Sequence, residues 1–375
     1  MTPAAPTPAT LRAYAAARTL WREQTLQAAL DRLGFLQADP IRAPARAQDL
    51  QLMQRVRAYR AGDLERRYAT LDIEEDSLPN YGFVTPEVHR LLHPRAARPA
   101  RIEHDAPGLS ERVLAHVREH GPTHPRRVAE ALGRTRVGNA WGGASSATTR
   151  ALEALHHAGH LRVTHREQGV KVYGPARTHA QPPLDTQARA EGIVRLIVNL
   201  YAPLPRQSLT YLLGLCSYGA PGMAADLRAA LTRLQDGWLA SASVNGLTYL
   251  WPAHESPDRD APGGARLLTP FDPLVWDRRR FEHLHGWTYR FEAYTPPARR
   301  TFGYYALPLL VSGRAVGWAN LTLRDGALHS DVQLTPGTRR TALLDRAVNA
   351  ELGRYRTFLG LPGTPPPEAP PAEAS

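Results

Sequence analysis

Two polar side chains stand two residues apart in an otherwise apolar run near the N-terminus. Gln37 and Asp39 lie between residues 33 and 41, and Pro40 follows the carboxylate directly. A proline drives the residue before it into an extended conformation, and residues i and i+2 of an extended chain point to the same side. The carboxamide and the carboxylate should therefore face one space. With Arg42 and Arg46 close behind, the pair suits chemistry on an anionic polymer.

A structural interpretation of the same residues competes with the chemical one. A short polar residue beside a proline is common in turns, so Asp39 could simply cap the helix that follows. The residues around the pair leave both interpretations open, and the rest of the chain must decide between them.

The composition favours an anionic partner. The chain has 375 residues, enough for about two to four domains with a sizeable core. Its 46 basic and 35 acidic residues give a net charge of +11. Such an excess on a folded protein points to a nucleic acid or another anionic surface. Lys171 is the only lysine, and GC-rich coding explains part of this arginine preference but not the sign of the charge.

Signals for cofactors and for membranes are weak. Cys216 is the only cysteine, has no metal-ligand spacing and fits a core position in a reducing compartment. The fifteen histidines form no HExxH motif. Glu74-Glu75-Asp76 is expected to be a solvated acidic turn, and His156-His157 a surface pair. The chain shows no signal peptide and no apolar stretch of membrane length, so we expect a cytoplasmic, nucleoid-associated monomer without a metal or cofactor.

Helical and β-type periodicities predict an α+β fold. Three successive segments each have helices followed by a hairpin, which is the order of a winged helix. The middle segment is the clearest, with helices over 110–120, 125–132 and 147–158 and strands over 161–165 and 170–173. The third segment contains Asn245-Gly246, the strongest hairpin-turn signal in the chain.

The period changes to β near the C-terminus. Strands are predicted over 288–295, 303–310, 315–323 and 327–334, followed by a closing helix over 339–359. These strands suggest a small antiparallel β-barrel or a curled sheet, and we expect the barrel. The predicted domains are a first winged-helix-like domain with the Gln-x-Asp segment (1–107), a second, basic winged helix (108–182), a third winged helix (183–260), the β-barrel (261–336), a C-terminal helix (337–361) and a disordered tail (362–375).

The middle segment carries more than half of the positive excess. Residues 111–177 hold eleven cations and five acids, a net charge of +6. In a winged helix the third helix addresses DNA, so Thr148, Thr149 and Arg150 would sit near a helix N-terminus that favours phosphate. A winged helix used only for packing or for protein contact is the alternative.

The C-terminal segment resembles a known family. It has LTPFDPLVWDR over 268–278, YRFEAY over 289–294 and RTFGYYALPLL over 300–310. These residues resemble the C-terminal β-barrel signature of the bacterial YcaQ/AlkZ-like winged-helix DNA glycosylases, also described as crosslink-repair glycosylases. The Gln-x-Asp segment with Arg46-Ala47 behind it is similar in type and position to the catalytic segment of that family. The resemblance covers residues 8–360.

The resemblance implies a monofunctional DNA repair glycosylase. Its members hydrolyse the N-glycosidic bond of bulky alkylated or crosslinked purines, of the N7-alkylguanine type, in double-stranded DNA and leave an abasic site. By this resemblance Asp39 would activate water or stabilise the sugar cation, and Gln37 would hold the water. The residues expected to contact DNA are Arg42, Arg46, Gln48, Arg55, Thr148, Thr149, Arg150, Arg278 and Arg300.

The chain departs from the family pattern in two places. Gln48 stands where many relatives have His, and residues 71–94 lack the Trp-x-His-x-x-Ser segment of those relatives. The preferred lesion is therefore open. The competing function is that of a non-catalytic winged-helix DNA-binding protein or transcriptional regulator.

A substitution at Arg150 tests the assignment of the DNA-addressing helix. Arg150→Ala should weaken binding to damaged and undamaged duplex alike, because a phosphate contact carries no information on the base. The slope of log affinity against log salt concentration should become shallower by about 1. Fluorescence anisotropy titrations at several salt concentrations measure both quantities. An unchanged affinity with an unchanged slope would refute the assignment.

Overall fold

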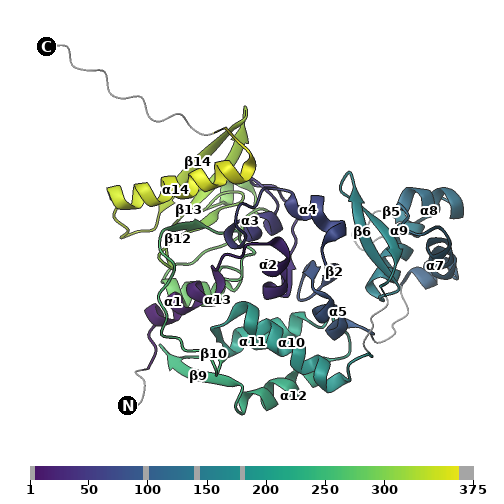
Figure 1. The fold of residues 1–375 in the computed structure, drawn as a ribbon, viewed down its shortest axis with the longest axis horizontal. Coiled ribbons are helices and arrows are strands. Elements are labelled where there is room, and N and C mark those ends of the chain that lie inside the picture. Colours follow the sequence, from purple (N-terminus) through teal and green to yellow (C-terminus); the bar gives the residue numbers. More distant parts are fainter. Residues whose placement is uncertain (1–4, 96–100, 139–143, 178–181, 363–375) are drawn as a thin grey trace. The chain divides into compact units, whose positions relative to one another are not determined.

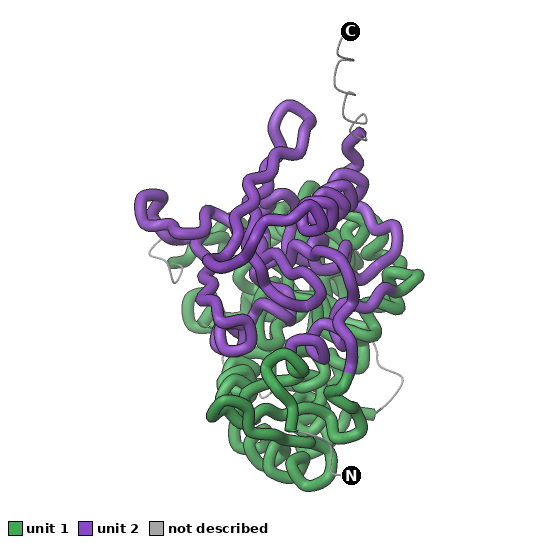
Figure 2. The backbone as a smooth tube through the Cα atoms, turned by 90° about the vertical axis from the view of Figure 1, so that its left-hand side faces the viewer, with its two compact units in different colours: residues 1–11, 23–39, 62–258 green, residues 12–22, 40–61, 259–375 purple. Residues whose placement is uncertain are grey.

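A computed structural model describes residues 5–95, 101–138, 144–177 and 182–362. The chain divides into two compact units (Figure 2). The first unit comprises residues 1–11, 23–39 and 62–258, and the second comprises residues 12–22, 40–61 and 259–375. The units are thus built from interleaved segments, whereas the sequence predicts consecutive domains. The predicted disordered tail lies, from residue 363 on, outside the described residues.

The first unit contains three helix-and-hairpin segments in tandem, and Figure 1 labels most of their helices and some of their strands. The first has α2 (Leu26–Leu33), β1 (Phe35–Gln37), α4 (Asp63–Arg67), the 3-10 helix η1 (Tyr68–Thr70), β2 (Glu74–Ser77), β3 (Tyr81–Val84) and α5 (Pro86–Leu92). The second has α6 (Arg101–Asp105), α7 (Leu109–His120), α8 (Pro125–Leu132), β4 (Arg136–Gly138), β5 (Ala144–Ser146), α9 (Ala147–His157), β6 (Leu161–Glu167) and β7 (Val170–Pro175). The third has α10 (Thr186–Tyr201), β8 (Leu204–Pro205), α11 (Arg206–Leu215), α12 (Ala224–Gln235), β9 (Leu239–Val244) and β10 (Leu247–Pro252).

The three segments share one pattern of strand pairing. In the first segment β1 pairs with β3, the second strand of the β2–β3 hairpin. In the third segment β8 pairs with β10, the second strand of the β9–β10 hairpin. In the second segment Thr123 forms an antiparallel bridge with Tyr173 of β7, the second strand of the β6–β7 hairpin. Each hairpin is therefore extended on the same side by an earlier part of its own segment.

Local sequence explains where several of these elements begin and end. The Thr25 hydroxyl caps α2 by accepting the Ala28 N–H at 3.1 Å, and Gly34 ends the helix with a φ of 69°. Asn245 and Gly246 take φ values of 46° and 80° between β9 and β10. These values suit a two-residue hairpin turn, and the Asn-Gly hairpin predicted from the sequence is confirmed.

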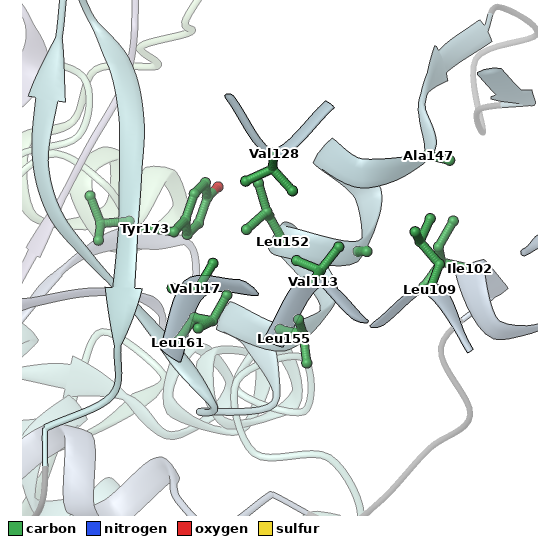
Figure 3. Close-up of a cluster of buried hydrophobic side chains, with 12 residues drawn as sticks. Ile102, Leu109, Val113, Val117, Val128, Ala147, Leu152, Leu155, Leu161 and Tyr173 are labelled. Atoms are coloured by element: carbon green, nitrogen blue, oxygen red, sulfur yellow. The ribbon is translucent and has the colours of Figure 1, made fainter. Parts of the chain in front are cut away.

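The second segment has a hydrophobic core of its own (Figure 3). Val113 and Val117 of α7 pack with Val128 of α8 and Leu152 of α9, and Tyr173 of β7 joins them from the hairpin. The helical spacing of these apolar residues puts them on one face of each helix, where burial removes them from water. The predicted helices and hairpin of this segment are confirmed as elements that share one core.

β2 consists mainly of buried acidic residues, each of which has basic partners in the first unit. Arg162 and Arg166 come from β6, which lies beside β2 (Figure 1). The ion pairs are Glu74 with Arg162 at 2.9 Å and Arg177 at 3.2 Å, Glu75 with Arg166 at 2.5 Å, and Asp76 with Arg95 at 2.7 Å. Asp76 also forms a hydrogen bond of 2.9 Å with His93. The expected solvated acidic turn is wrong. Burial of these carboxylates is tolerated because each is paired.

The surroundings of Asp76 control its protonation. Burial alone would raise the pKa of this carboxyl, but the hydrogen bond from His93 and the charge of Arg95 outweigh burial and hold the pKa well below its usual range. Burial lowers the pKa of His93, so its neutral ring donates the Nε2–H to Asp76. Burial also lowers the pKa of His156 to about 4. His156 and His157 are both half-buried, so the pair expected at the surface is only partly exposed.

The second unit is built around a four-stranded antiparallel sheet. Its elements are most of α1 (Pro8–Thr19), α3 (Ala47–Arg55), β11 (Ala265–Leu267), α13 (Arg278–His285), the 3-10 helix η2 (Pro297–Arg299), β12 (Leu307–Val311), β13 (Arg314–Arg324), β14 (Ala327–Leu334) and α14 (Ala342–Leu359). The strand order is β11-β12-β13-β14, and α14 packs against β11. The α+β class is confirmed. No helix in the described parts of the chain is long and apolar enough to cross a membrane.

The predicted closed β-barrel is wrong. In the described residues the sheet is open, with β11 and β14 at its edges. Residues 288–295, predicted as a strand, form an irregular loop. The Tyr289 hydroxyl donates to the Ala306 carbonyl at 2.7 Å, and the Glu292 carboxylate accepts the N–H groups of Thr301 and Phe302 at 2.8 and 2.7 Å. Side-chain hydrogen bonds to the backbone thus hold this loop, whereas a further strand would need backbone hydrogen bonds to a neighbouring strand.

A buried ion pair joins α3 to the C-terminal part of the second unit. Arg55 Nη1 and Nη2 donate to the two carboxylate oxygens of Asp272 at 2.7 and 3.1 Å, and both side chains are 0 % exposed. Arg55 also donates to the Gln51 carbonyl, and Asp272 accepts the Leu274 N–H, each at 3.0 Å. The aspartate of the Phe-Asp-Pro signature therefore neutralises a buried arginine.

Removal of one partner from this pair should destabilise the protein strongly. Arg55→Met leaves Asp272 buried without its counter-ion, which should lower the free energy of unfolding by about 3–5 kcal/mol. The double variant Arg55→Met, Asp272→Leu should recover most of this loss, because apolar replacement of a whole buried pair is close to neutral. Urea denaturation measures both changes. A double variant no more stable than the single one would contradict the electrostatic explanation.

The paired state of Asp76 predicts a loss of stability in acid. Because the pKa is lower in the folded chain than in the unfolded chain, the carboxylate stabilises the fold above the unfolded value of about 4. This contribution is lost as the pH falls through the folded value. Asp76→Asn should therefore be less stable at pH 7 and should show a smaller further decline below pH 4. Urea denaturation from pH 7 to pH 3 tests this, and parallel curves for the two proteins would contradict it.

Candidate functional site

The pairing of β1 with β3 fixes the position of Gln37. This residue ends β1 and lies opposite Gly82 of β3. Gln37 is buried, with 8 % of its surface exposed. Its Oε1 accepts a hydrogen bond from Asn80 Nδ2 at 3.4 Å. With Oε1 turned toward Asn80, the amide nitrogen of Gln37 points the other way. The carboxamide therefore has a defined orientation.

The backbone pairing runs one residue past β1. The Ala38 N–H donates to the Tyr81 carbonyl at 3.0 Å. A further step along this register would bring residue 39 opposite Asn80. Because side chains alternate between the two faces of a ladder, Gln37 and Asp39 would then share the face that carries Asn80. Asp39 is half-buried, and the co-facial pair stays a prediction.

Asp39 does not cap the helix that follows it. The next helix, α3, begins at Ala47, its N-cap residue is Arg46, and its N-cap makes no side-chain hydrogen bond. The structural interpretation of Asp39 as a helix cap therefore fails. Asp39 instead stands in the connection between β1 and α3.

Gly82 leaves the face beside Gln37 without a side chain. A Cβ atom at this position would lie 2.3 Å from the Leu36 carbonyl oxygen and 2.8 Å from Cε2 of Phe35. Backbone atoms cannot give way at such a distance, so only glycine fits. The close approach of β1 and β3 therefore depends on Gly82.

Lys171 of β7, the only lysine of the chain, lies against the opposite face of this sheet. Tyr81 alternates with Asn80 and Gly82, so its ring lies on that face, where its hydroxyl is bonded to Glu75. The Lys171 ammonium lies 3.9 Å from the centroid of the Tyr81 ring. Burial lowers the pKa of Lys171. The sheet therefore separates this amine from the face of Gln37 and Asp39.

A histidine and aspartate cluster resembles a metal site only in part. Asp76, His89 and His93 bring three possible ligand atoms within 4.8 Å of one another, and the two rings stack with centroids 4.3 Å apart. However, the Arg95 guanidinium lies 2.7 Å from the same carboxylate. A fixed positive charge at this distance opposes a cation. We assign the cluster to ion pairing and not to metal binding.

The second segment presents only part of its predicted DNA-contacting set. Thr148 is 1 % exposed, and its hydroxyl lies 2.8 Å from the Ser146 hydroxyl. This burial contradicts the DNA contact predicted for Thr148, whose hydroxyl is engaged at the start of α9. Thr149 and Arg150 are half-buried, and their contacts with DNA stay predictions.

Arg42, Arg46 and Gln48 belong to the second unit. Arg42 is exposed, Arg46 is half-buried at the N-cap of α3, and Gln48 is buried within the first turn of α3. An exposed guanidinium can meet a phosphate, and the roles of all three residues stay predictions.

Two arginines predicted to contact DNA make hydrogen bonds within the second unit. Arg55 is fully buried against Asp272 and offers no group to a phosphate. Arg278 donates to the Pro270 carbonyl at 2.9 Å and to that of Val275, and burial lowers its pKa. The burial of Arg55 contradicts its predicted DNA contact, whereas Arg278 is half-buried and its contact with DNA stays a prediction.

The position of Arg300 is compatible with its predicted contact with DNA. Its Nε donates to the Thr295 carbonyl at 2.7 Å, and its guanidinium lies 5.1 Å from the centroid of the Tyr304 ring. The residue is half-buried. Its contact with DNA stays a prediction.

Neither Asn80 nor Gly82 is among the site residues predicted from the sequence. Both lie in a stretch with Pro79, which reads as a loop because proline, asparagine and glycine are typical of turns. β3 is four residues long, too short for a clear two-residue period. The available signal was the glycine itself, because an isolated glycine beside a strand marks a close backbone approach.

One family model matches most of the chain. The model describes the AlkZ-like DNA glycosylases and matches residues 30–358, a span that includes Gln37, Asp39 and the C-terminal signature. No solved structure gave a significant match. The matched span covers well over half of the sequence, and it shows that the chain belongs to the AlkZ-like DNA glycosylase family.

Proposed function

We propose that this protein hydrolyses the N-glycosidic bond of N7-alkylated or crosslinked purines in double-stranded DNA, with Gln37 and Asp39 as the catalytic pair. One observation carries the proposal. Gln37 pairs with Gly82 and accepts a hydrogen bond from Asn80, and a continuation of this register would bring the Asp39 carboxylate to the face of the carboxamide. Membership of a DNA glycosylase family supports the class of reaction.

The chemistry needs few groups. A purine alkylated at N7 is already cationic, so the base leaves without a strong general acid. The reaction then requires a group that stabilises the positive charge on the sugar and a positioned water. The Asp39 carboxylate can do the first electrostatically and can accept a proton from the water. Gln37 can hold the water through its carboxamide.

Asn80 acts as a positioning residue in this proposal. Its Nδ2 donates to Gln37 Oε1, which fixes which end of the carboxamide faces away from Asn80. A carboxamide has a donor end and an acceptor end. If it rotated freely, it could not present the same end to a bound water. Gly82 lets β3 approach β1 closely beside Gln37, because a Cβ atom there would meet the Leu36 carbonyl oxygen and the Phe35 ring.

The location of Lys171 supports a monofunctional enzyme. A glycosylase that also cleaves the strand uses an amine to attack the sugar. Lys171 is the only lysine, and its ammonium lies over the Tyr81 ring on the other face of the sheet. Water is therefore the proposed nucleophile, and the product is an abasic site.

The three tandem segments are proposed to be winged helices. All three segments have helices followed by a hairpin. In each of them, the second strand of the hairpin pairs with an earlier strand or bridge residue of the same segment. The second segment would address DNA through the N-terminal part of α9, where Thr149 and Arg150 lie. Arg42, Arg46, Gln48 and Arg300 would add contacts from the second unit.

Substitution of Asp39 tests the proposed chemistry. Wild-type protein should convert an oligonucleotide with N7-methylguanine or a nitrogen-mustard crosslink into a product that mild alkali cleaves. Asp39→Asn should lower the single-turnover rate by about 10²–10⁴-fold, because the variant loses the negative charge and the proton acceptor. Its affinity for the same duplex should be kept.

Asp236→Asn is a matched control, since Asp236 is an exposed aspartate of the same unit. This variant should react at the wild-type rate. Equal scission by wild type and Asp39→Asn would refute the role of Asp39. No scission by wild type across a panel of alkylated and crosslinked purines, with DNA binding intact, would favour a non-catalytic DNA-binding protein.

A further inference from the structure

A loop of the second unit displays aromatic rings between arginines. In residues 289–305, Tyr294 is 82 % exposed and Tyr304 is 46 % exposed. Arg290 and Arg299 are exposed in the same loop. Single exposed apolar residues are common, but two large rings among cations on one loop form a patch suited to contact with another molecule.

The base of this loop is fixed. The Glu292 carboxylate accepts backbone N–H groups of the loop, as described above. In addition, the Phe302 carbonyl accepts hydrogen bonds from Asn320 Nδ2 at 2.7 Å and Trp318 Nε1 at 3.1 Å. Gly303 has a φ of 118°, and a Cβ atom there would lie 2.3 Å from Asn320 Oδ1. Only glycine fits this conformation and this space. The rings are therefore displayed from a defined scaffold.

Further aromatic residues support the two exposed rings. The Tyr294 ring meets the Phe291 ring edge to face at 6.1 Å, and Phe291 meets Tyr305 in the same way at 5.5 Å. Arg300 lies over Tyr304, and its bond to the Thr295 carbonyl holds the guanidinium there. Each exposed ring therefore has a neighbour that limits its movement.

The charges of the loop favour an anionic partner with flat, apolar groups. Glu292 is the only acid between residues 289 and 305. Glu292 is 5 % exposed, and its carboxylate is engaged by backbone N–H groups. The outer face of the loop therefore combines aromatic rings with positive charge. Nucleobases stack on such rings, and arginines meet the phosphates beside them.

We propose that Tyr294 and Tyr304, with Arg300, form a stacking site for an unpaired nucleobase of DNA. Arg300 is among the residues predicted from the sequence to contact DNA, whereas neither tyrosine has a predicted role. The inference rests on the proposed function in so far as that function makes DNA the partner. Displacement of a damaged or crosslinked base exposes unpaired bases, and an aromatic surface would capture one of them.

The test compares two duplexes that differ by one unpaired base. Anisotropy titrations measure the affinity of wild type, Tyr294→Ala and Tyr294→Phe for a fully paired duplex and for the same duplex with a single bulged 2-aminopurine. Tyr294→Ala should lower affinity for the bulged duplex by roughly 5- to 100-fold, the range for loss of one stacked base. Affinity for the paired duplex should stay within about twofold, and Tyr294→Phe should bind like wild type, because stacking needs only the ring.

Tyr211→Ala is the matched control, since Tyr211 is a 64 % exposed tyrosine of α11 in the first unit. It should bind both duplexes like wild type. Unchanged affinity of Tyr294→Ala for the bulged duplex, or an equal loss on both duplexes, would overturn the stacking site. The binding assay needs no base release. A wild type that releases no base would therefore refute the proposed catalysis while a selective loss in Tyr294→Ala would still support the stacking site.

Discussion

The close pairing of β1 with β3 is the constraint on which the candidate site depends. Gly82 permits this approach, because any side chain there would meet the Leu36 carbonyl oxygen. The pairing holds Gln37 opposite Gly82 and within a hydrogen bond of Asn80, and its continuation would bring the Asp39 carboxylate to the same face, as proposed. A strand pair of this kind is rigid and places polar groups more accurately than a free loop.

Positive charge in this protein has two distinct uses. Arg162, Arg166 and Arg177 neutralise the buried carboxylates of β2, and Arg55 neutralises Asp272 in the second unit. The charges of these arginines are balanced locally by the carboxylates that they contact. The net charge of +11 therefore describes the field of the whole molecule. The contact residues must be sought among exposed arginines such as Arg42.

The sequence predicts the local elements well and their assembly less well. Capping at Thr25 and the Asn245-Gly246 turn depend on adjacent residues, so they can be recognised without a structure. The partners of β2 lie far along the chain, and no local pattern reveals that Glu75 meets Arg166. The barrel prediction failed at 288–295 for a similar reason. Strand-like residues there are held as a loop by contacts with residues 301–306.

The most direct test of the central claim is a double-mutant cycle on single-turnover base release. Chromatography would measure free N7-methylguanine released by wild type, Gln37→Ala, Asp39→Asn and the double variant. If the two side chains act on one water, their effects should be far from additive, and the double variant should be little slower than Asp39→Asn. Release by all four proteins at one rate, or strictly additive losses, would contradict a shared catalytic face.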